Sequence, residues 1–265
     1  MSTPLKRPLI IAHRGSSAAA PENTIAAFER AMEDGAEGIE FDVRITRDGI
    51  PVVFHDSSLK RIASNEERIT SLFSREMPLV DVGSWFNRAN PEFANRKYIG
   101  EPIPTLEKTL DVLAGFEGPI YVEIKTAKKH MRKMAGAVGE LLKARKHRNK
   151  FIVKSFEPEV MPLIREITGD IELAGLFAPT VLRLLRKEKK LVPKALGLGF
   201  ERLSIHFSMA SRELMRAANA LEMPVTVWTV DSRRIFRKCM ASGIDSVITN
   251  NPAKMLVERD GAFVI

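Results

Sequence analysis

Two acidic residues, Glu40 and Asp42, stand one residue apart in the segment GIEFDV. In an extended strand, residues with this spacing point to the same face, so the two carboxylates face the same way. The residues that alternate with them are apolar and point to the opposite face. Glu123 and Lys125 repeat the spacing further along the chain. The pattern predicts polar strand faces that together carry three carboxylates.

Three carboxylates that face one point repel one another unless a positive charge lies between them. A divalent cation satisfies this need, and oxygen ligands favour Mg²⁺ or Ca²⁺ over zinc. We therefore predict that Glu40, Asp42 and Glu123 bind one such cation. The alternative is a set of structural ion pairs between these carboxylates and Arg14 and Lys125.

Two of the five histidines, His13 and His55, are expected beside these carboxylates. Oxygen-rich sites for hard cations rarely use imidazole, so general acid and general base are better roles than metal ligand. A single histidine at a strand end is often a packed core residue, but two at one place favour catalysis. Arg14 and Lys125 would bind an anion such as a phosphodiester, or else pair with the carboxylates.

Apolar, β-branched segments alternate with helical patterns along the chain. The predicted strands are 9–13, 38–43, 51–55, 120–125, 151–155, 172–177, 203–207, 225–230 and 246–249. The predicted helices are 23–34, 105–116, 128–146, 157–167, 180–189, 211–222, 232–242 and 252–258. This alternation predicts a parallel sheet. In a parallel barrel the active site lies at the carboxyl ends of the strands.

Strand 51–55 does not fit the alternation, because only the turn 46–50 separates it from the strand before. A parallel crossover needs a dozen or more residues, so the two strands are predicted to be antiparallel. In that hairpin Asp42 would lie near Val53, and Glu40 near His55. Without strand 51–55, eight βα units remain, which predicts one (β/α)8 barrel domain over residues 1–265.

Residues 56–104 also interrupt the alternation, with many polar residues and four prolines. We interpret them as an insertion subdomain after the second barrel strand that covers the active-site mouth. Trp85, Phe86 and Phe93 would be its apolar anchors. The alternative is a disordered loop.

The chain has 265 residues, 45% of them hydrophobic, and a net charge of +8. No segment approaches the ~18 apolar residues of a membrane span, and the N-terminus lacks a signal-peptide pattern, so we expect a cytoplasmic protein. The basic residues cluster in 128–150 and 183–194. Solvated helix faces explain them better than nucleic-acid binding, although a small anionic substrate or peripheral contact with an anionic membrane also suits the charge. The single Cys239 excludes an internal disulfide.

Motifs along nearly the whole chain resemble those of the glycerophosphodiester phosphodiesterase family. The longest is EFDVRITRDGIPVVFHD at 40–56, which is highly specific. Shorter ones are HRG at 13–15, PENT at 21–24, GSWF at 83–86, IPTLE at 103–107, VEIK at 122–125, SF at 155–156, VWTVD at 227–231 and ITNNP at 248–252.

The resemblance implies a (β/α)8 TIM barrel that hydrolyses a glycerophosphodiester to sn-glycerol 3-phosphate and an alcohol, within lipid and glycerol metabolism. It implies a metal on the three carboxylates, acid–base catalysis by His13 and His55, and phosphate contacts from Arg14 and Lys125. Either histidine could be the acid. The nucleophile could be water or, by analogy with related phospholipases, the glycerol 2-hydroxyl.

Two other functions fit the same sequence. One is a lysophospholipase D, in which the insertion and the basic segment 178–204 reach a lipid substrate. The other is a catalytically silent barrel that binds a phosphorylated ligand, although binding alone needs no histidine pair. We expect both the insertion and 178–204 to stand over the barrel mouth.

The chain departs from the family at Asn250, where an Asp is usual, and we expect this position to be structural. Trp228 is predicted to contact the substrate's alcohol rather than to pack the barrel. His206 is assigned equally to the pocket and to the core. Lys154 has no assigned role, and Glu22 is explained by the positive end of the following helix.

Overall fold

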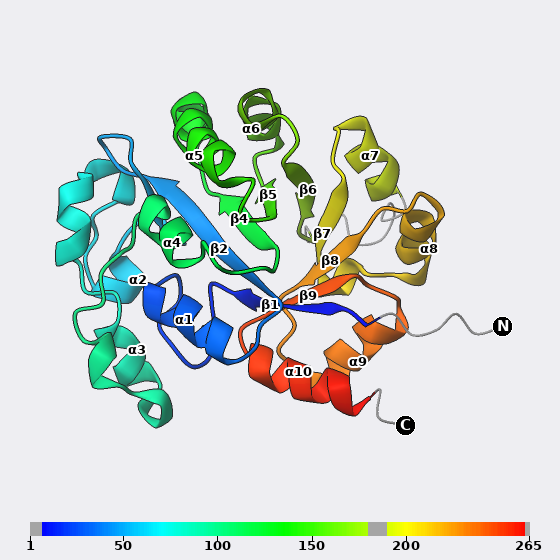
Figure 1. Cartoon of the computed structure of the whole chain (residues 1–265), viewed down its shortest axis with the longest axis horizontal. Helices are drawn as coiled ribbons and strands as arrows, with labels where there is room; N and C mark the ends of the chain where they lie inside the picture. Colours follow the sequence, from blue (N-terminus) through cyan, green and yellow to red (C-terminus); the bar gives the residue numbers. More distant parts are fainter. Residues whose placement is uncertain (1–6, 180–189, 263–265) are drawn as a thin grey trace.

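A closed barrel of parallel strands forms the centre of the molecule (Figure 1). The structure is a computed structural model that describes residues 7–179 and 190–262. Within these residues the barrel strands are β1 (Leu9–His13), β2 (Gly38–Ile45), β4 (Ile120–Ile124), β5 (Phe151–Ser155), β6 (Glu172–Phe177), β7 (Arg202–His206), β8 (Val225–Trp228) and β9 (Ser246–Thr249). Since β1 pairs in parallel with both β2 and β9, the barrel closes, which confirms the predicted (β/α)8 fold.

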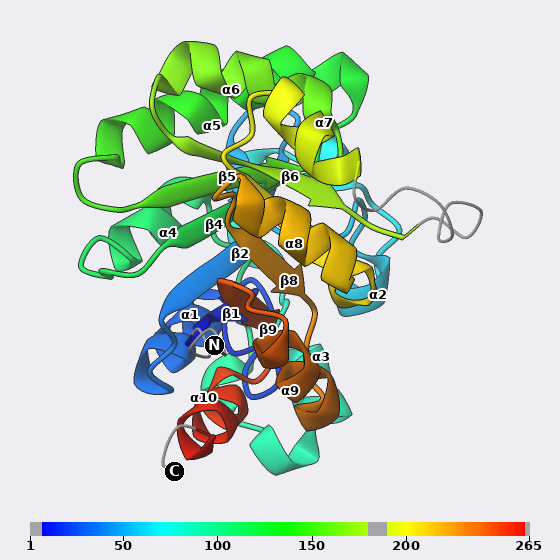
Figure 2. The same ribbon diagram turned by 90° about the vertical axis from the view of Figure 1, so that its right-hand side faces the viewer.

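One helix follows each barrel strand and covers the outer wall (Figures 1 and 2). In the described part of the chain these helices are α1 (Ile25–Glu33), α4 (Leu106–Val112), α5 (Met131–Arg145), α6 (Met161–Thr168), α7 (Leu191–Gly197), α8 (Arg212–Ala220), α9 (Arg233–Ala241) and α10 (Pro252–Gly261). Short 3-10 turns η5 (Lys128–His130), η6 (Pro158–Val160) and η8 (Phe207–Met209) precede α5, α6 and α8. The main hydrophobic core lies between this outer layer and the strands.

The hairpin strand β3 (Pro51–Val53) pairs with β2 in antiparallel orientation, as expected. Its register differs by one residue from the predicted one, because Val43 faces Val53. Phe54, not Val53, is therefore opposite Asp42, and its N–H donates to the carbonyl of Asp42 at 2.9 Å. The turn sets this register: the N–H of Thr46 donates to the carbonyl of Ile50 at 3.1 Å across a short loop.

The insertion forms short helices around its own hydrophobic cluster, beside β2 and α1 in Figure 1. They are α2 (Lys60–Ala63), η1 (Ile69–Ser71), η2 (Ser74–Leu79), α3 (Ser84–Ala89), η3 (Pro91–Phe93) and η4 (Arg96–Tyr98). Phe86 is buried against Tyr98 and the alanines of α1, with Trp85 partly buried beside them. Phe93 was expected to be an anchor, but its side chain is 42% exposed.

The basic segment 178–204 lies only partly within the described residues. The helix predicted at 180–189 lies outside the described residues. The helix of this βα unit is α7, which contacts β7 and α8 and buries Val192 and Ala195 in the main core. α7 thus covers the outer wall of the barrel, although the segment was expected to stand over its mouth.

In the described ranges, no helix combines the length and the apolar character that crossing a membrane requires.

Candidate active site

The acidic side chains of β2 lie inside the barrel near the carboxyl ends of the strands. Glu40 and Asp42 are buried there, while the alternating residues Phe41 and Val43 belong to the outer hydrophobic core. The sheet register sets Asp42 beside Glu123 of β4. Oxygen atoms of the three carboxylates lie within 4.8 Å of one another. Strand alternation and register therefore make one buried acidic cluster, which is a candidate site for a cation.

A buried lysine from β5 separates two of these carboxylates. Nζ of Lys154 lies 2.9 Å from Oε1 of Glu40 and 3.1 Å from Oε2 of Glu123, and its side chain is 3% exposed. Burial lowers the pKa of Lys154, but the charges of Glu40 and Glu123 outweigh burial and raise it above the ordinary value. Lys154 therefore remains charged. The sequence predicted that Lys154 lies at the end of its strand, but it did not reveal that Glu40 and Glu123 are its partners.

Two half-buried cations, Arg14 and Lys125, follow the ends of β1 and β4. Nε of Arg14 lies 3.1 Å from Oδ2 of Asp42, and Nζ of Lys125 lies 3.2 Å from Oδ1 of Asp42 and contacts Glu123. Burial raises the pKa of Asp42, but Arg14 and Lys125 outweigh it and hold the pKa well below its usual range. The ion pairs considered as the alternative to a metal site do form. With Lys154, three cations face three carboxylates.

The turn after β1 fixes the position of Arg14. Its backbone is in the left-handed region, with φ 57°, and its N–H donates to Oε2 of Glu40 at 3.2 Å. A Cβ on the next residue, Gly15, would lie 2.5 Å from the carbonyl oxygen of Ala27, so only glycine fits there. Strained backbone of this kind persists only where the surroundings hold it, as these contacts do.

Two residues of the PENT motif also contact the cluster. The side-chain amide of Asn23 donates to Oδ2 of Asp42 at 3.0 Å, a contact that the sequence interpretation missed. Glu22 accepts hydrogen bonds from Arg14 at 2.8 Å and from Arg61 of α2 at 2.6 Å. Glu22 therefore links the barrel to the insertion, a role beyond the helix-dipole explanation.

The two histidines lie on either side of β2 in sequence and have different partners. Nε2 of His13 is 3.9 Å from Oε2 of Glu40, and its Nδ1 is 2.6 Å from Oδ1 of Asn250. Nδ1 of His55 is 2.7 Å from Oδ1 of Asp56. Burial lowers the pKa of His55, although the charge of Asp42 opposes this shift. Asn250, which was expected to be structural, thus contacts a candidate catalytic group.

An aromatic group lies at the ends of β5, β7 and β8. Trp228 makes edge contacts with Phe156, at 5.9 Å between ring centroids, and with His206, at 5.5 Å. Nζ of Lys125 lies 5.7 Å from the centroid of Phe156, so this group borders the charged cluster. Phe156 is exposed and the described residues offer Nε1 of Trp228 no hydrogen-bond partner. His206 thus lies within this aromatic group at the strand ends.

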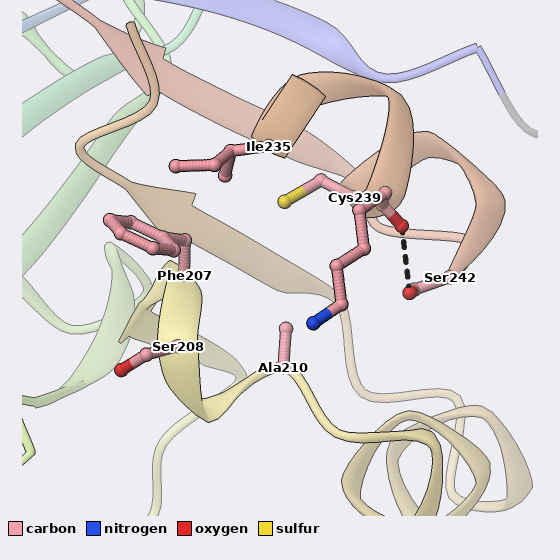
Figure 3. A pocket seen from close by; sticks show the side chains of 7 residues that line it. Phe207, Ser208, Ala210, Ile235, Cys239 and Ser242 are labelled. Atoms are coloured by element: carbon pink, nitrogen blue, oxygen red, sulfur yellow. Dashed lines mark hydrogen bonds between the residues drawn. The ribbon is translucent and has the colours of Figure 1, made fainter. Parts of the chain in front are cut away.

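A separate cavity of about 210 Å³ lies outside the barrel, between η8 and α9 (Figure 3). Phe207, Ile235 and Cys239 form its apolar side, and Lys238 and Ser242 lie at its rim. Burial raises the pKa of the Cys239 thiol to about 11, so the thiol is protonated near neutral pH. This cavity contains no residue of the acidic cluster.

These features define an enzyme class: a (β/α)8 barrel whose mouth holds buried carboxylates, basic residues and two histidines. The chain belongs to the glycerophosphoryl diester phosphodiesterase family, whose model matches residues 13–254. It is 30% identical over 260 residues to a glycerophosphodiester phosphodiesterase of Caldanaerobacter subterraneus subsp. tengcongensis. The matched region covers 96% of this chain and 99% of that protein.

Solved structures agree. An Oleispira antarctica phosphodiesterase in complex with the product sn-glycerol-3-phosphate has a TM-score of 0.84 and 26% identity, and the match covers 96% of this chain and 97% of that one. A glycerophosphodiester phosphodiesterase from Thermotoga maritima has a TM-score of 0.71 and 27% identity, covering 94% and 97% of the two chains. The comparisons confirm the predicted family, fold and enzyme class.

The first prediction concerns Lys154. Replacing it in Lys154→Met should lower the free energy of unfolding by about 3–5 kcal/mol, because Glu40 and Glu123 lose a buried partner. Chemical denaturation of the metal-free protein measures the change. Lys128→Met is the matched control, since Lys128 is 80% exposed and its contact with Glu159 is 3.9 Å. Its effect should be at most ~1 kcal/mol. Equal effects of the two changes would contradict the ion-pair analysis.

The second prediction concerns acid stability. The folded-state pKa values of Asp42 and Glu123 lie below their unfolded values of 3.8 and 4.5, because nearby cations outweigh burial. A carboxyl with a depressed folded pKa contributes stability above its unfolded pKa and loses it as pH falls through the folded pKa. The metal-free protein should therefore lose stability progressively below about pH 4.5 in denaturation titrations. In Asp42→Asn this loss should be smaller, and an unchanged pH profile would refute the assignment.

Proposed function

We propose that the chain hydrolyses glycerophosphodiesters to sn-glycerol 3-phosphate and an alcohol, using a divalent cation and two histidines. The observation that carries the proposal is the cluster of Glu40, Asp42 and Glu123 with His13 beside it, in a chain of this family. The product complex of the Oleispira antarctica relative supports the same substrate class.

The acidic cluster fits a hard cation. Its three donors are carboxylate oxygens, which suit Mg²⁺ or Ca²⁺. Oε1 of Glu40 is buried without a hydrogen bond from any described residue, although Nζ of Lys154 lies close to it. A buried carboxylate oxygen without an aligned donor is suited to ligate a metal. When bound, the cation would stabilise negative charge on the phosphate oxygens.

Arg14 and Lys125 are the cations best placed to bind the phosphate. Both lie at strand ends, and each side chain is about one-sixth exposed, at 17% and 16%. They reach solvent while Lys154 does not. Their charges would orient the diester and stabilise the additional charge of the transition state.

The two histidines would carry the proton transfers. Each has Nδ1 against an oxygen acceptor, which leaves Nε2 for the substrate. One imidazole takes the proton of the nucleophile as the new P–O bond forms, and the other donates a proton to the alcohol oxygen as its P–O bond breaks. Water is consumed overall, directly or by opening a cyclic phosphate made by the glycerol 2-hydroxyl. Burial keeps His55 neutral near pH 7, a form that can accept a proton.

Trp228 and Phe156 would contact the departing alcohol, because Phe156 borders Lys125 and Trp228 packs edge-on against Phe156. We also propose that residues 56–104 form a subdomain beside the mouth. The hydrogen bond from Arg61 to Glu22 joins this subdomain to the barrel. Glycerol and lipid metabolism and a cytoplasmic location are part of the same proposal.

A lysophospholipase D is the second candidate. The observation that favours it is the exposure of Leu79, Phe93 and Ile99 in the insertion, at 84%, 42% and 63%. Exposed apolar side chains of this kind suit contact with a lipid.

The third prediction separates these functions. Glycerophosphocholine, glycerophosphoethanolamine, glycerophosphoglycerol and a lysophospholipid are assayed with Mg²⁺, Ca²⁺ and EDTA. We expect much higher kcat/KM for the three deacylated diesters, loss of activity in EDTA and recovery with either metal. Higher kcat/KM for the lysophospholipid would favour the second candidate. Full activity after exhaustive chelation would refute the metal, and inactivity on every substrate under all conditions would indicate a silent barrel.

The fourth prediction concerns His13 and His55. His13→Ala and His55→Ala should each lower kcat about 100- to 10,000-fold, with little change in fold or metal binding. The double variant should lose less than the product of the two effects, because one catalytic cycle uses both groups. His130→Ala is the control, since His130 lies in η5.

A diester with a p-nitrophenol leaving group assigns the roles. This group departs without protonation, so it should restore turnover only in the variant that lacks the general acid. Wild-type turnover of a natural diester by both single variants would refute acid–base catalysis by this pair.

A further inference from the structure

The imidazole of His13 is held by a residue from the opposite end of the chain. Its Nδ1 lies 2.6 Å from Oδ1 of Asn250, which follows β9. The hydroxyl of Ser17 donates to the same amide oxygen at 2.8 Å. β1 and β9 are neighbouring strands, so closure of the barrel creates this contact.

Asn250 is in turn fixed by Asp231, which lies beyond the end of β8. The backbone N–H of Asn250 donates to Oδ1 of Asp231 at 2.8 Å, and its side-chain amide nitrogen donates to Oδ2 at 2.7 Å. An ionised carboxylate only accepts hydrogen bonds, so the amide nitrogen must face Asp231. The amide oxygen must then face His13. Thr249 also donates to Oδ1 of Asp231, at 2.9 Å, which fixes the carboxylate.

This orientation determines the tautomer of His13. An amide oxygen cannot donate, so Nδ1 of the imidazole must carry a proton and donate it. Nε2 is then the atom left for proton transfer, on the side where Oε2 of Glu40 lies 3.9 Å away. Which imidazole nitrogen faces the reaction is set by the hydrogen bond of the other nitrogen.

We propose that Asn250, oriented by Asp231, is a positioning residue that holds His13 in the Nδ1–H tautomer and directs Nε2 toward the substrate phosphate. This rests on the proposed catalytic role of His13. The adjacent Asn251 has a different role. Its side chain accepts a hydrogen bond from the N–H of Lys254 at 3.0 Å and caps α10.

The test combines kinetics with ¹⁵N NMR of the imidazole nitrogens, at a pH where His13 is neutral. The five histidines are labelled, and His13→Gln identifies the signals of His13. In the wild-type protein Nδ1 should be the protonated nitrogen. In Asn250→Ala the Nε2–H form should appear, and kcat should fall about 10- to 100-fold with little change in KM. Asp231→Asn should also increase the Nε2–H form and lower kcat, but by less than Asn250→Ala does.

Asn251→Ala is the matched control: it should lower the melting temperature through loss of the helix cap while kcat and the His13 signals stay as in the wild type. Two results would overturn the proposal: an Nε2–H tautomer in the wild-type protein, or wild-type kcat in Asn250→Ala when His13→Ala is inactive. If Asn250→Ala fails to fold, the proposal is still tested by the His13 tautomer in the wild-type spectrum and by the tautomer and kcat of Asp231→Asn. Full activity of His13→Ala would refute the catalytic role of His13. The NMR spectra would then still show whether Asn250 fixes the tautomer of His13.

Discussion

The structure depends on a balance of charge inside the barrel. Burying three carboxylates together is highly unfavourable unless positive groups accompany them. Here Lys154 lies between Glu40 and Glu123, and Lys125 and Arg14 contact Asp42. Further down the barrel, Tyr121 lies among aliphatic side chains, and a separate ion pair joins Arg202 of β7 to Glu172 of β6 at 2.6 Å. The three carboxylates and their three cations therefore gather at the end of the barrel where the loops converge.

Barrel closure brings these groups together from distant parts of the sequence. Parallel pairing in register sets His13 beside Glu40, Asp42 beside Glu123, and Glu123 beside Lys154. Alternation along each strand then decides which side chains enter the barrel and which pack against helices. A shift of one residue would exchange the two sets. The outer hydrophobic core and the inner acidic cluster consequently enforce the same register.

Local sequence was enough to predict the strands, the (β/α)8 order and the inward carboxylates, since these follow from alternation and from the short turn before β3. Contacts that depend on closure were beyond it. Asn250 meets His13 only because β9 pairs with β1. The contact of Lys154 with Glu40, between strands that lie on either side of β4, was also beyond local sequence. The hairpin register also depended on detailed turn geometry at Thr46, which composition does not specify.

The same charges suggest how the site could accept an anionic diester. Arg14 contacts Asp42 and Lys125 contacts Asp42 and Glu123, so the positive and negative charges of the cluster balance. If the carboxylates held a divalent cation, as proposed, they would no longer need these two side chains as counter-charges. In the proposed enzyme Arg14 and Lys125, which reach solvent, would then be available to the phosphate, and the site would have a net positive charge. Lys154 is too deeply buried to follow them and stays as the fixed counter-charge. In the proposed enzyme, the exposed cations serve the substrate and the buried one serves the fold.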